Sequence, residues 1–146
     1  MRVVLQRVCS AAVRVNGEVT GSTGPGLYAL VGVGHASTKE DARWLATKTE
    51  GLRVFSDDQG LMNRSVAEIG GGVLAISQFT LYGDARKGRR PSFIAAAPPQ
   101  RAQRLYEVYC DALRVPVGRG VFGAHMDIEA HLDGPVTILL RREGGV

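Results

Sequence analysis

Short apolar runs that end at glycine-containing turns dominate this chain and constrain its fold more than any other feature. Residues 2–8 and 11–15 have an extended pattern, and Asn16-Gly17 is typical of a type I′ hairpin turn leading into the next strand. Leu27 to Val33 and Gly72 to Ile76 have the composition of buried strands. The pattern therefore predicts a strand-rich protein.

Two segments show helical periodicity instead. Thr38 to Asp41 resembles a capping box, apolar residues recur at helical spacing after it, and Gly51 can end that helix. A second helix is expected to begin near Pro99. The stripe that we expect it to pack in the core consists of Ala102, Leu105, Tyr109 and Leu113.

Together these elements predict an α+β fold. The connections are mostly short, which favours antiparallel pairing over a repeated βαβ pattern. We expect residues 1–146 to form a single compact domain, with mainly antiparallel strands in a barrel-like sheet and two main helices. Strands at 124–132 and 135–141 are expected to form a closing hairpin, because Asp133-Gly134 between alternating apolar runs is a turn signal.

The composition excludes several classes of protein. A hydrophobic content of 45% supports a real core, and no apolar span reaches the length that a bilayer needs. We expect a soluble, cytoplasmic protein without a signal peptide and without a membrane partner. Cys9 and Cys110 are too few and too scattered for a disulfide framework, and we expect both to be small buried hydrophobes.

We expect neither a metal nor a nucleotide cofactor. The three histidines, His35, His125 and His131, lack the spacing of a metal motif, and two of them fall on the polar side of one alternating strand. No Gly-x-Gly-x-x-Gly or Walker sequence opens a helix.

The charge balance favours an acidic partner. The net charge is +4, and arginine supplies 15 of the 18 cations. The guanidinium binds phosphate through two parallel hydrogen bonds. A solvated basic surface would give the same composition, so this observation leaves both interpretations open.

Two short stretches contain the candidate site residues. Ser77-Gln78-Phe79-Thr80 ends an apolar run, so hydroxyl and amide groups stand where a buried strand ends. Gly134-Pro135-Val136-Thr137 opens another run. Pro135 lacks a backbone N–H donor, and it lowers the free-energy cost of a cis peptide bond after Gly134.

These two stretches, with matches along nearly the whole chain, resemble the D-aminoacyl-tRNA deacylases. The further matching segments, in order and spacing, are Leu5-Gln6-Arg7-Val8, Asn16-Gly17-Glu18-Val19, Gly32-Val33, Arg53-Val54-Phe55-Ser56-Asp57, Gly60-Leu61-Met62-Asn63, Arg90-Pro91-Ser92-Phe93 and Met126.

The resemblance implies hydrolysis of the ester that joins a D-amino acid, or mischarged glycine, to the 3′ end of tRNA. It implies a homodimer in which main-chain groups of Gly134 and Pro135 enter the partner's active site and reject L-amino acids. It assigns Arg7 to the support of that gate and Met126 and Thr137 to the pocket. An alternative for Arg7 is a surface cation on an edge strand.

The residues leave the nucleophile open. Neither stretch contains a base beside Thr80 or Ser77, and Asp84 has the setting of an exposed turn residue. We prefer an activated water, with backbone N–H groups near Phe79 and Thr80 holding the oxyanion and the ribose hydroxyl of the substrate assisting. Direct attack by Thr80 is the alternative.

The chain departs from the family pattern at two positions. Leu132 stands where the family usually has Asn, and its alternation with Met126 and Ile128 predicts that it faces the apolar side. The local role of that Asn is then lost or taken over by Asp133. Leu61 stands where Lys is usual after glycine.

A basic run follows the first stretch and is expected to contact tRNA, mainly through its backbone and sugars. Its cations are Arg86, Lys87, Arg89 and Arg90. Two alternatives to a deacylase remain at this point. A non-catalytic tRNA- or RNA-binding module would show aromatic residues among these cations, and none precedes Phe93. A hydrolase of small esters or D-peptides would need no basic run.

Overall fold

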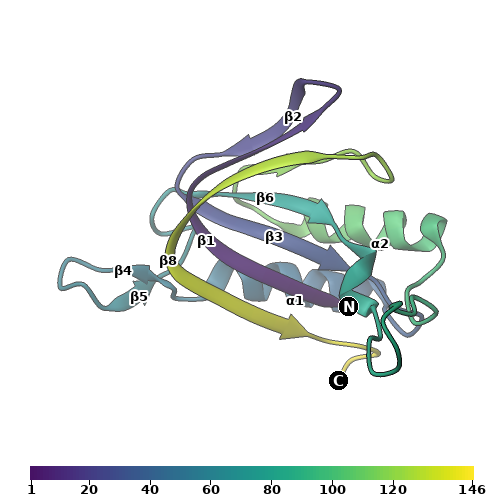
Figure 1. Cartoon of the computed structure of the whole chain (residues 1–146). Coiled ribbons are helices and arrows are strands. Elements are labelled where there is room, and N and C mark those ends of the chain that lie inside the picture. Colours follow the sequence, from purple (N-terminus) through teal and green to yellow (C-terminus); the bar gives the residue numbers. More distant parts are fainter.

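A long strand, β1 (Arg2–Val15), organises the sheet in the computed structural model, which describes residues 1–146. One edge of β1 pairs with β8 (Asp127–Arg141), and the other pairs with β3 (Gly26–Gly32) and then β2 (Glu18–Thr23), all antiparallel. The buried side chains of β1 change register where bulges interrupt its pairing with β8, so the strand curves (Figure 1).

The turn between β1 and β2 confirms the predicted hairpin. Asn16 has φ 51° and Gly17 has φ 82°, and a type I′ turn requires positive φ at both central positions.

The rest of the sheet is parallel, so the prediction of mainly antiparallel pairing was only partly correct. β6 (Gly72–Ser77) runs parallel to β3, and β7 (Val117–Arg119) runs parallel to β6. The crossovers contain α1 (Lys39–Gly51) and α2 (Pro99–Ala112). A helical crossover is what parallel neighbours need, and the irregular segments around each helix hid these βαβ units in the sequence.

The predicted closing hairpin was also wrong. β8 continues without a turn through Gly134 and Pro135, whose peptide bond is cis. The reason is the length of β1, which offers partners to both halves of β8, from Asp127 opposite Arg14 to Arg141 opposite Arg2.

The mixed sheet is nearly closed into a barrel, because β2 approaches β7. Two glycines permit this approach. A Cβ on Gly21 would lie 2.4 Å from the Arg119 carbonyl oxygen, and one on Gly118 would lie 2.6 Å from the Ser22 carbonyl oxygen. Side chains at either position would hold the two edges apart.

Both helices lie side by side against one face of the sheet, behind β3 and β6 in Figure 1. α1 begins with the predicted capping box, in which Thr38 and Asp41 exchange side-chain and backbone hydrogen bonds. The predicted stripe of α2 is buried in the core. Within that core, Thr49 of α1 shares a hydrogen bond of 2.9 Å with the hydroxyl of Tyr109.

The remaining elements lie outside this barrel and helix layer. β4 (Phe55–Ser56) and β5 (Met62–Arg64) form a two-stranded arm that projects from the body in Figure 1. A 3-10 turn, η1 (Phe79–Tyr82), follows β6. No helix has the length and apolar character needed to cross a membrane. Cys110 is buried as expected, whereas Cys9 is exposed, so that prediction was wrong.

Candidate active site

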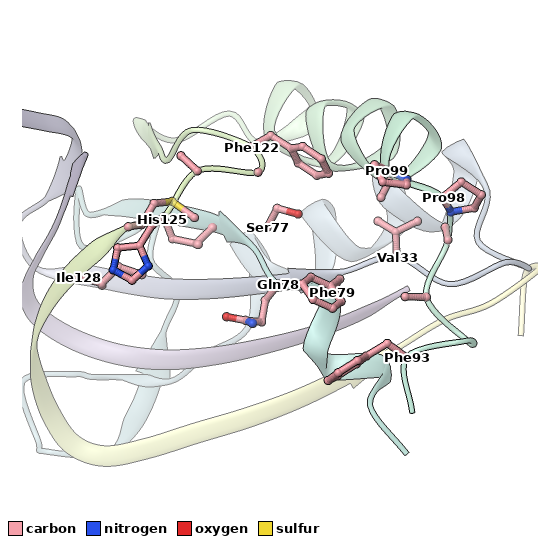
Figure 2. A pocket seen from close by; sticks show the side chains of 17 residues that line it. Val33, Ser77, Gln78, Phe79, Phe93, Pro98, Pro99, Phe122, His125 and Ile128 are labelled. Carbon is pink, nitrogen blue, oxygen red and sulfur yellow. The ribbon is translucent and has the colours of Figure 1, made fainter. Parts of the chain in front are cut away.

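A cavity of about 750 Å³ opens where β3 and β6 end, and it is walled by the first turn of α2 and the segment before β8 (Figure 2). Its lining is predominantly apolar, with few polar groups. Phe122, Pro98 and Pro99 lie on one side in Figure 2, and Phe79 and Phe93 lie on the other. A concave, apolar site with few polar groups is typical of a small-ligand pocket.

The first sequence stretch contributes directly to this cavity. Ser77 ends β6, and Ser77, Gln78 and Phe79 all line the cavity. Thr80 does not line it. The Gln78 side-chain amide donates a hydrogen bond to the Thr80 hydroxyl, and the Gln78 backbone N–H donates to the Val31 carbonyl at 2.8 Å.

The backbone of η1 offers hydrogen-bond donors at this strand end. The first amides of a 3-10 turn have no acceptor within the turn, and here those amides belong to Phe79 and Thr80. η1 packs closely on the end of β3, since a Cβ on Gly32 would lie 2.9 Å from the Leu81 Cβ. The turn that carries the two amides is therefore packed against β3.

Two aromatic rings stand at the cavity edge. Phe79 and Phe93 meet edge to face, with ring centroids 5.1 Å apart and planes at 72°. Phe79 is 54% exposed and Phe93 is 39% exposed. Rings this open to solvent can still stack against a planar ligand.

Met126 and His125 reach the same cavity from a distant part of the chain. Met126 packs over Gly120, where a Cβ would lie 2.5 Å from the Met126 sulfur. His125 is the only ionisable side chain among the lining residues, and Figure 2 shows it at the end away from Pro98. Sequence reasoning placed His125 on the polar side of a strand and missed it, because only barrel closure brings it beside β6.

No carboxylate lines the cavity, and the carboxylate nearest to the first stretch in sequence is that of Asp84. Hydrogen bonds from Arg86 lower the pKa of the Asp84 carboxyl to about 2; the side chain contributes most and the backbone N–H next. The Arg86 guanidinium donates to both carboxylate oxygens, at 2.9 and 2.6 Å. Asp84 is therefore an ionised, occupied acceptor at neutral pH and a poor proton acceptor.

The second stretch lies outside the cavity. Gly134, Pro135 and Thr137 are exposed and none is among the lining residues. Gly134 has φ 143°, a conformation that favours glycine, and a Cβ there would lie 2.4 Å from the Val136 nitrogen. The Gln6 side-chain amide donates to the Thr137 hydroxyl at 3.5 Å.

Arg7 contacts the residue before Gly134. It lies on β1 between β3 and β8, so it is not on an edge strand. Its guanidinium donates to the carbonyl oxygens of Val54 at 2.7 Å and Asp133 at 3.2 Å. Arg7 therefore links Val54, which precedes β4, to Asp133, which precedes Gly134.

Three further predictions concern exposed positions. Leu132 is 46% exposed, so the prediction that it faces the apolar side was wrong. All residues from Glu129 to Pro135 are exposed, so neither face of β8 is covered in this stretch. Leu61 is 57% exposed on the β4–β5 arm.

In the basic run, Arg86 is paired with Asp84, whereas Lys87, Arg89 and Arg90 are exposed without an ion pair. No cluster of three metal-ligating side chains is present.

Comparisons with known proteins agree with one another. The family model described as D-Tyr-tRNA(Tyr) deacylase matches residues 4–141. The D-aminoacyl-tRNA deacylase of Deinococcus deserti is 59% identical over 143 residues, covering 96% of this chain and 98% of the relative. That of Heliobacterium modesticaldum is 52% identical and covers 99% of each chain.

Solved structures show the same fold. One described as a c-Myc DNA unwinding element binding protein has a TM-score of 0.91 and 36% identity, covering 97% of this chain and 99% of that one. Another, described as a probable eukaryotic D-amino acid tRNA deacylase, has a TM-score of 0.79 and 20% identity, covering 95% and 97% of the two chains.

Proposed function

The chain belongs to the D-Tyr-tRNA(Tyr) deacylase family and has the D-aminoacyl-tRNA deacylase function of its relatives, and from this premise we propose how its residues hydrolyse the ester. The predicted enzyme class, an ester hydrolase in tRNA proofreading, is confirmed by the same relatives. A non-catalytic RNA-binding module and a hydrolase of free small esters are thereby set aside.

The proposed reaction takes place at the end of β6. The ester carbonyl lies against the amides of Phe79 and Thr80, which stabilise the oxyanion as a nucleophile attacks. Each such donor is worth about 3 kcal/mol of barrier. Ser77 and Gln78 complete the polar wall of the cavity, and Gln78 orients the Thr80 hydroxyl.

Water is the proposed nucleophile. A hydroxyl nucleophile needs an adjacent base, and the Thr80 hydroxyl accepts its hydrogen bond from an amide, which cannot take a proton. Asp84 is occupied by Arg86. The water is therefore activated by a group outside the first stretch, with the ribose hydroxyl of the substrate as the proposed aid.

Selectivity in this proposal comes from the main chain of Gly134 and Pro135. Backbone groups clash with any L side chain whatever its chemistry, and they admit both a D-amino acid and glycine. The observation that supports a shared site is the length of β8. Ile128 lines the cavity, and the six residues from there to Gly134 span about 20 Å of extended strand.

The proposal therefore requires a homodimer. A gate so far from its own cavity acts on the cavity of a second copy, and Gly134, Pro135 and Thr137 all lie exposed on β8 for such a contact. Leu139, 77% exposed, lies on the same side of the strand as Pro135 and Thr137. An apolar residue there suits a protein interface.

The tRNA end is proposed to lie along the open side of the cavity. Phe79 and Phe93 offer ring edges and faces for a terminal base. The free cations of the basic run, Lys87, Arg89 and Arg90, are placed after η1 for phosphate contact.

The test compares hydrolysis of matched D- and L-aminoacyl-tRNA by the wild-type protein, Gly134→Ala and the control Gly24→Ala. A Cβ on Gly24 meets nothing within 4 Å, so the control should match wild type. We expect wild type to cleave only the D-ester, and Gly134→Ala to lose D-ester cleavage or to begin cleaving the L-ester. Identical behaviour of the two variants would remove Gly134 from the gate.

A further inference from the structure

A second hollow, the cationic cleft, lies between the start of α1 and the first two turns of α2. It has a volume of about 340 Å³. Its walls are Ser37, Thr38, Lys39, Arg101, Arg104 and Leu105. The cleft therefore contains three cationic side chains and no carboxylate.

Arg101 is exposed, but a hydrogen bond anchors its side chain in this cleft. Its guanidinium donates to the Ser37 carbonyl at 2.6 Å. Ser37 is fully buried, and its hydroxyl accepts from the Gly34 N–H at 2.9 Å. An anchored guanidinium loses little further freedom when it binds a ligand.

Lys39 and Arg104 lack a protein partner for their charge. Both are exposed, and neither takes part in a salt bridge. The neighbouring acid Asp41 is occupied by Thr38, Gly144 and Gly145 amides, and Glu107 accepts from Gln103. None of the three cations forms an ion pair with a carboxylate, the exposed Glu40 beside Lys39 included, so all three are left to attract an anion.

The cleft adjoins the active-site cavity across α2. Pro98, Pro99 and Ala102 line the cavity, whereas Arg101, Arg104 and Leu105 line the cleft. At 100° per residue, these two sets occupy adjacent flanks of the same helix. Only the first turns of α2, about 10 Å wide, separate the two hollows.

We propose that the cationic cleft binds backbone phosphates of the tRNA acceptor arm while the aminoacylated end lies in the cavity. The inference rests on the proposed function, because it assumes that the cavity holds the 3′ end. Arginine and lysine bind phosphate oxygens without reading sequence, which suits an enzyme that serves many tRNAs. The cleft is separate from the basic run at 86–90 and adds a second phosphate contact.

The first experiment measures binding of deacylated tRNA to the double variant Lys39→Ala/Arg104→Ala as a function of salt. Arg101 is left intact because of its bond to Ser37. We expect Kd to rise by about tenfold at low salt and the slope of log Kd against log salt to fall by about 1 for each cation removed.

The control is Lys48→Ala/Arg114→Ala. Lys48 lies in the last turn of α1 and Arg114 follows α2, so the same net charge is removed from the opposite ends of the same helices. We expect this control to bind as wild type does. If both double variants weaken tRNA binding equally, the proposal for the cleft is wrong. It is also wrong if neither variant weakens tRNA binding.

A second measurement separates the cleft from the catalytic proposal. The KM of Lys39→Ala/Arg104→Ala should rise for D-aminoacyl-tRNA but stay unchanged for 3′-D-aminoacyl-adenosine, which is too small to reach the cleft. A parallel loss on both substrates would place the two cations in the active site and overturn the inference. If wild type cleaves neither substrate, the proposed mechanism fails, and the tRNA affinities still decide on the cleft.

Discussion

The guanidinium of Arg7 lies 3.2 Å from the carboxylate of Asp133, and it thereby fixes the residue that precedes Gly134 and Pro135. The Arg7 side chain is 13% exposed and also donates to the Val54 carbonyl at 2.7 Å. One side chain on β1 thus joins β8 to the segment before β4.

Arg7→Lys should loosen this junction, because an ammonium on a lysine stem cannot reproduce the fork of the guanidinium. We expect the free energy of unfolding to fall by about 2 kcal/mol, the worth of hydrogen bonds to a charged group. We also expect the ratio of D- to L-ester cleavage to fall. Urea unfolding and the two hydrolysis rates measure both effects. Arg14→Lys is the control, since its ion pair with Glu129 is exposed; equal effects in both variants would contradict a role for Arg7.

Thr80→Ala should keep most of its activity, because water rather than Thr80 is the proposed nucleophile. We expect kcat for D-aminoacyl-tRNA to fall by about tenfold or less. Removal of a true nucleophile typically costs about 10⁶-fold. Single-turnover kinetics distinguish the two, and a burst of released tRNA with an acylated wild-type protein would show that Thr80 or Ser77 is acylated.

His125→Gln should lower kcat/KM for D-aminoacyl-tRNA about fivefold, the worth of one hydrogen bond. The reason is that His125 is the only ionisable side chain that lines the cavity. Hydrolysis rates of the two variants His125→Gln and His131→Gln measure the effect, and His131→Gln is the control because His131 does not line the cavity. Equal rates for both variants would contradict the prediction.

Asp41 should make folding stability sensitive to acid. Burial alone would raise the pKa of its carboxyl, but the backbone N–H groups of Gly145, Gly144 and Thr38 outweigh burial, and the pKa lies below its usual value. A depressed pKa means that the stabilisation is complete above about pH 4, the ordinary value, and is lost as pH falls further. The urea midpoint of wild type should therefore drop more between pH 5 and pH 2 than that of Asp41→Asn. The exposed Asp127→Asn variant serves as control and should follow wild type.

Leu139→Lys should convert the proposed dimer into a monomer. Leu139 is 77% exposed in the single chain, so a lysine there should leave the stability of that chain nearly unchanged. In the proposed interface, the lysine charge would be buried without a partner, which would weaken the dimer. Light scattering after gel filtration should give twice the chain mass for wild type and for Val19→Lys, which is 53% exposed on β2. A wild-type mass of one chain would contradict the shared site.

Local chemistry explains which parts of the fold were predictable. Thr38 and Asp41 cap a helix by bonds within four residues, and Asn16-Gly17 sets its own turn, so both can be read from neighbours alone. Asp133-Gly134 carries an equally strong local turn signal. There the long-range pairing of β8 with β1 overrides it, which no local pattern reveals.

The same contrast applies to the site. That Ser77, Gln78 and Phe79 line a cavity could be anticipated, because they follow a buried strand and cavities open where strands end. Thr80, from the same stretch, does not line it. The positions of His125 and the cationic side chains of α2 could not be anticipated, because their place depends on barrel closure and on how α2 packs against the residues after β3. Parallel pairing of β3 and β6 likewise depends on a crossover whose middle has no regular pattern.

In the proposed dimer, the uninterrupted strand β8 sets the distance between the wall of one active site and the gate of the other. Its start lines a cavity, and its Gly134 and Pro135 stand a fixed number of residues further on. Because side chains alternate between the two faces of a strand, deleting or inserting a single residue between Ile128 and Gly134 would turn every later side chain to the opposite face. Single substitutions along this stretch keep that spacing, whereas a change in its length would alter the distance from the cavity wall at Ile128 to Gly134 and Pro135.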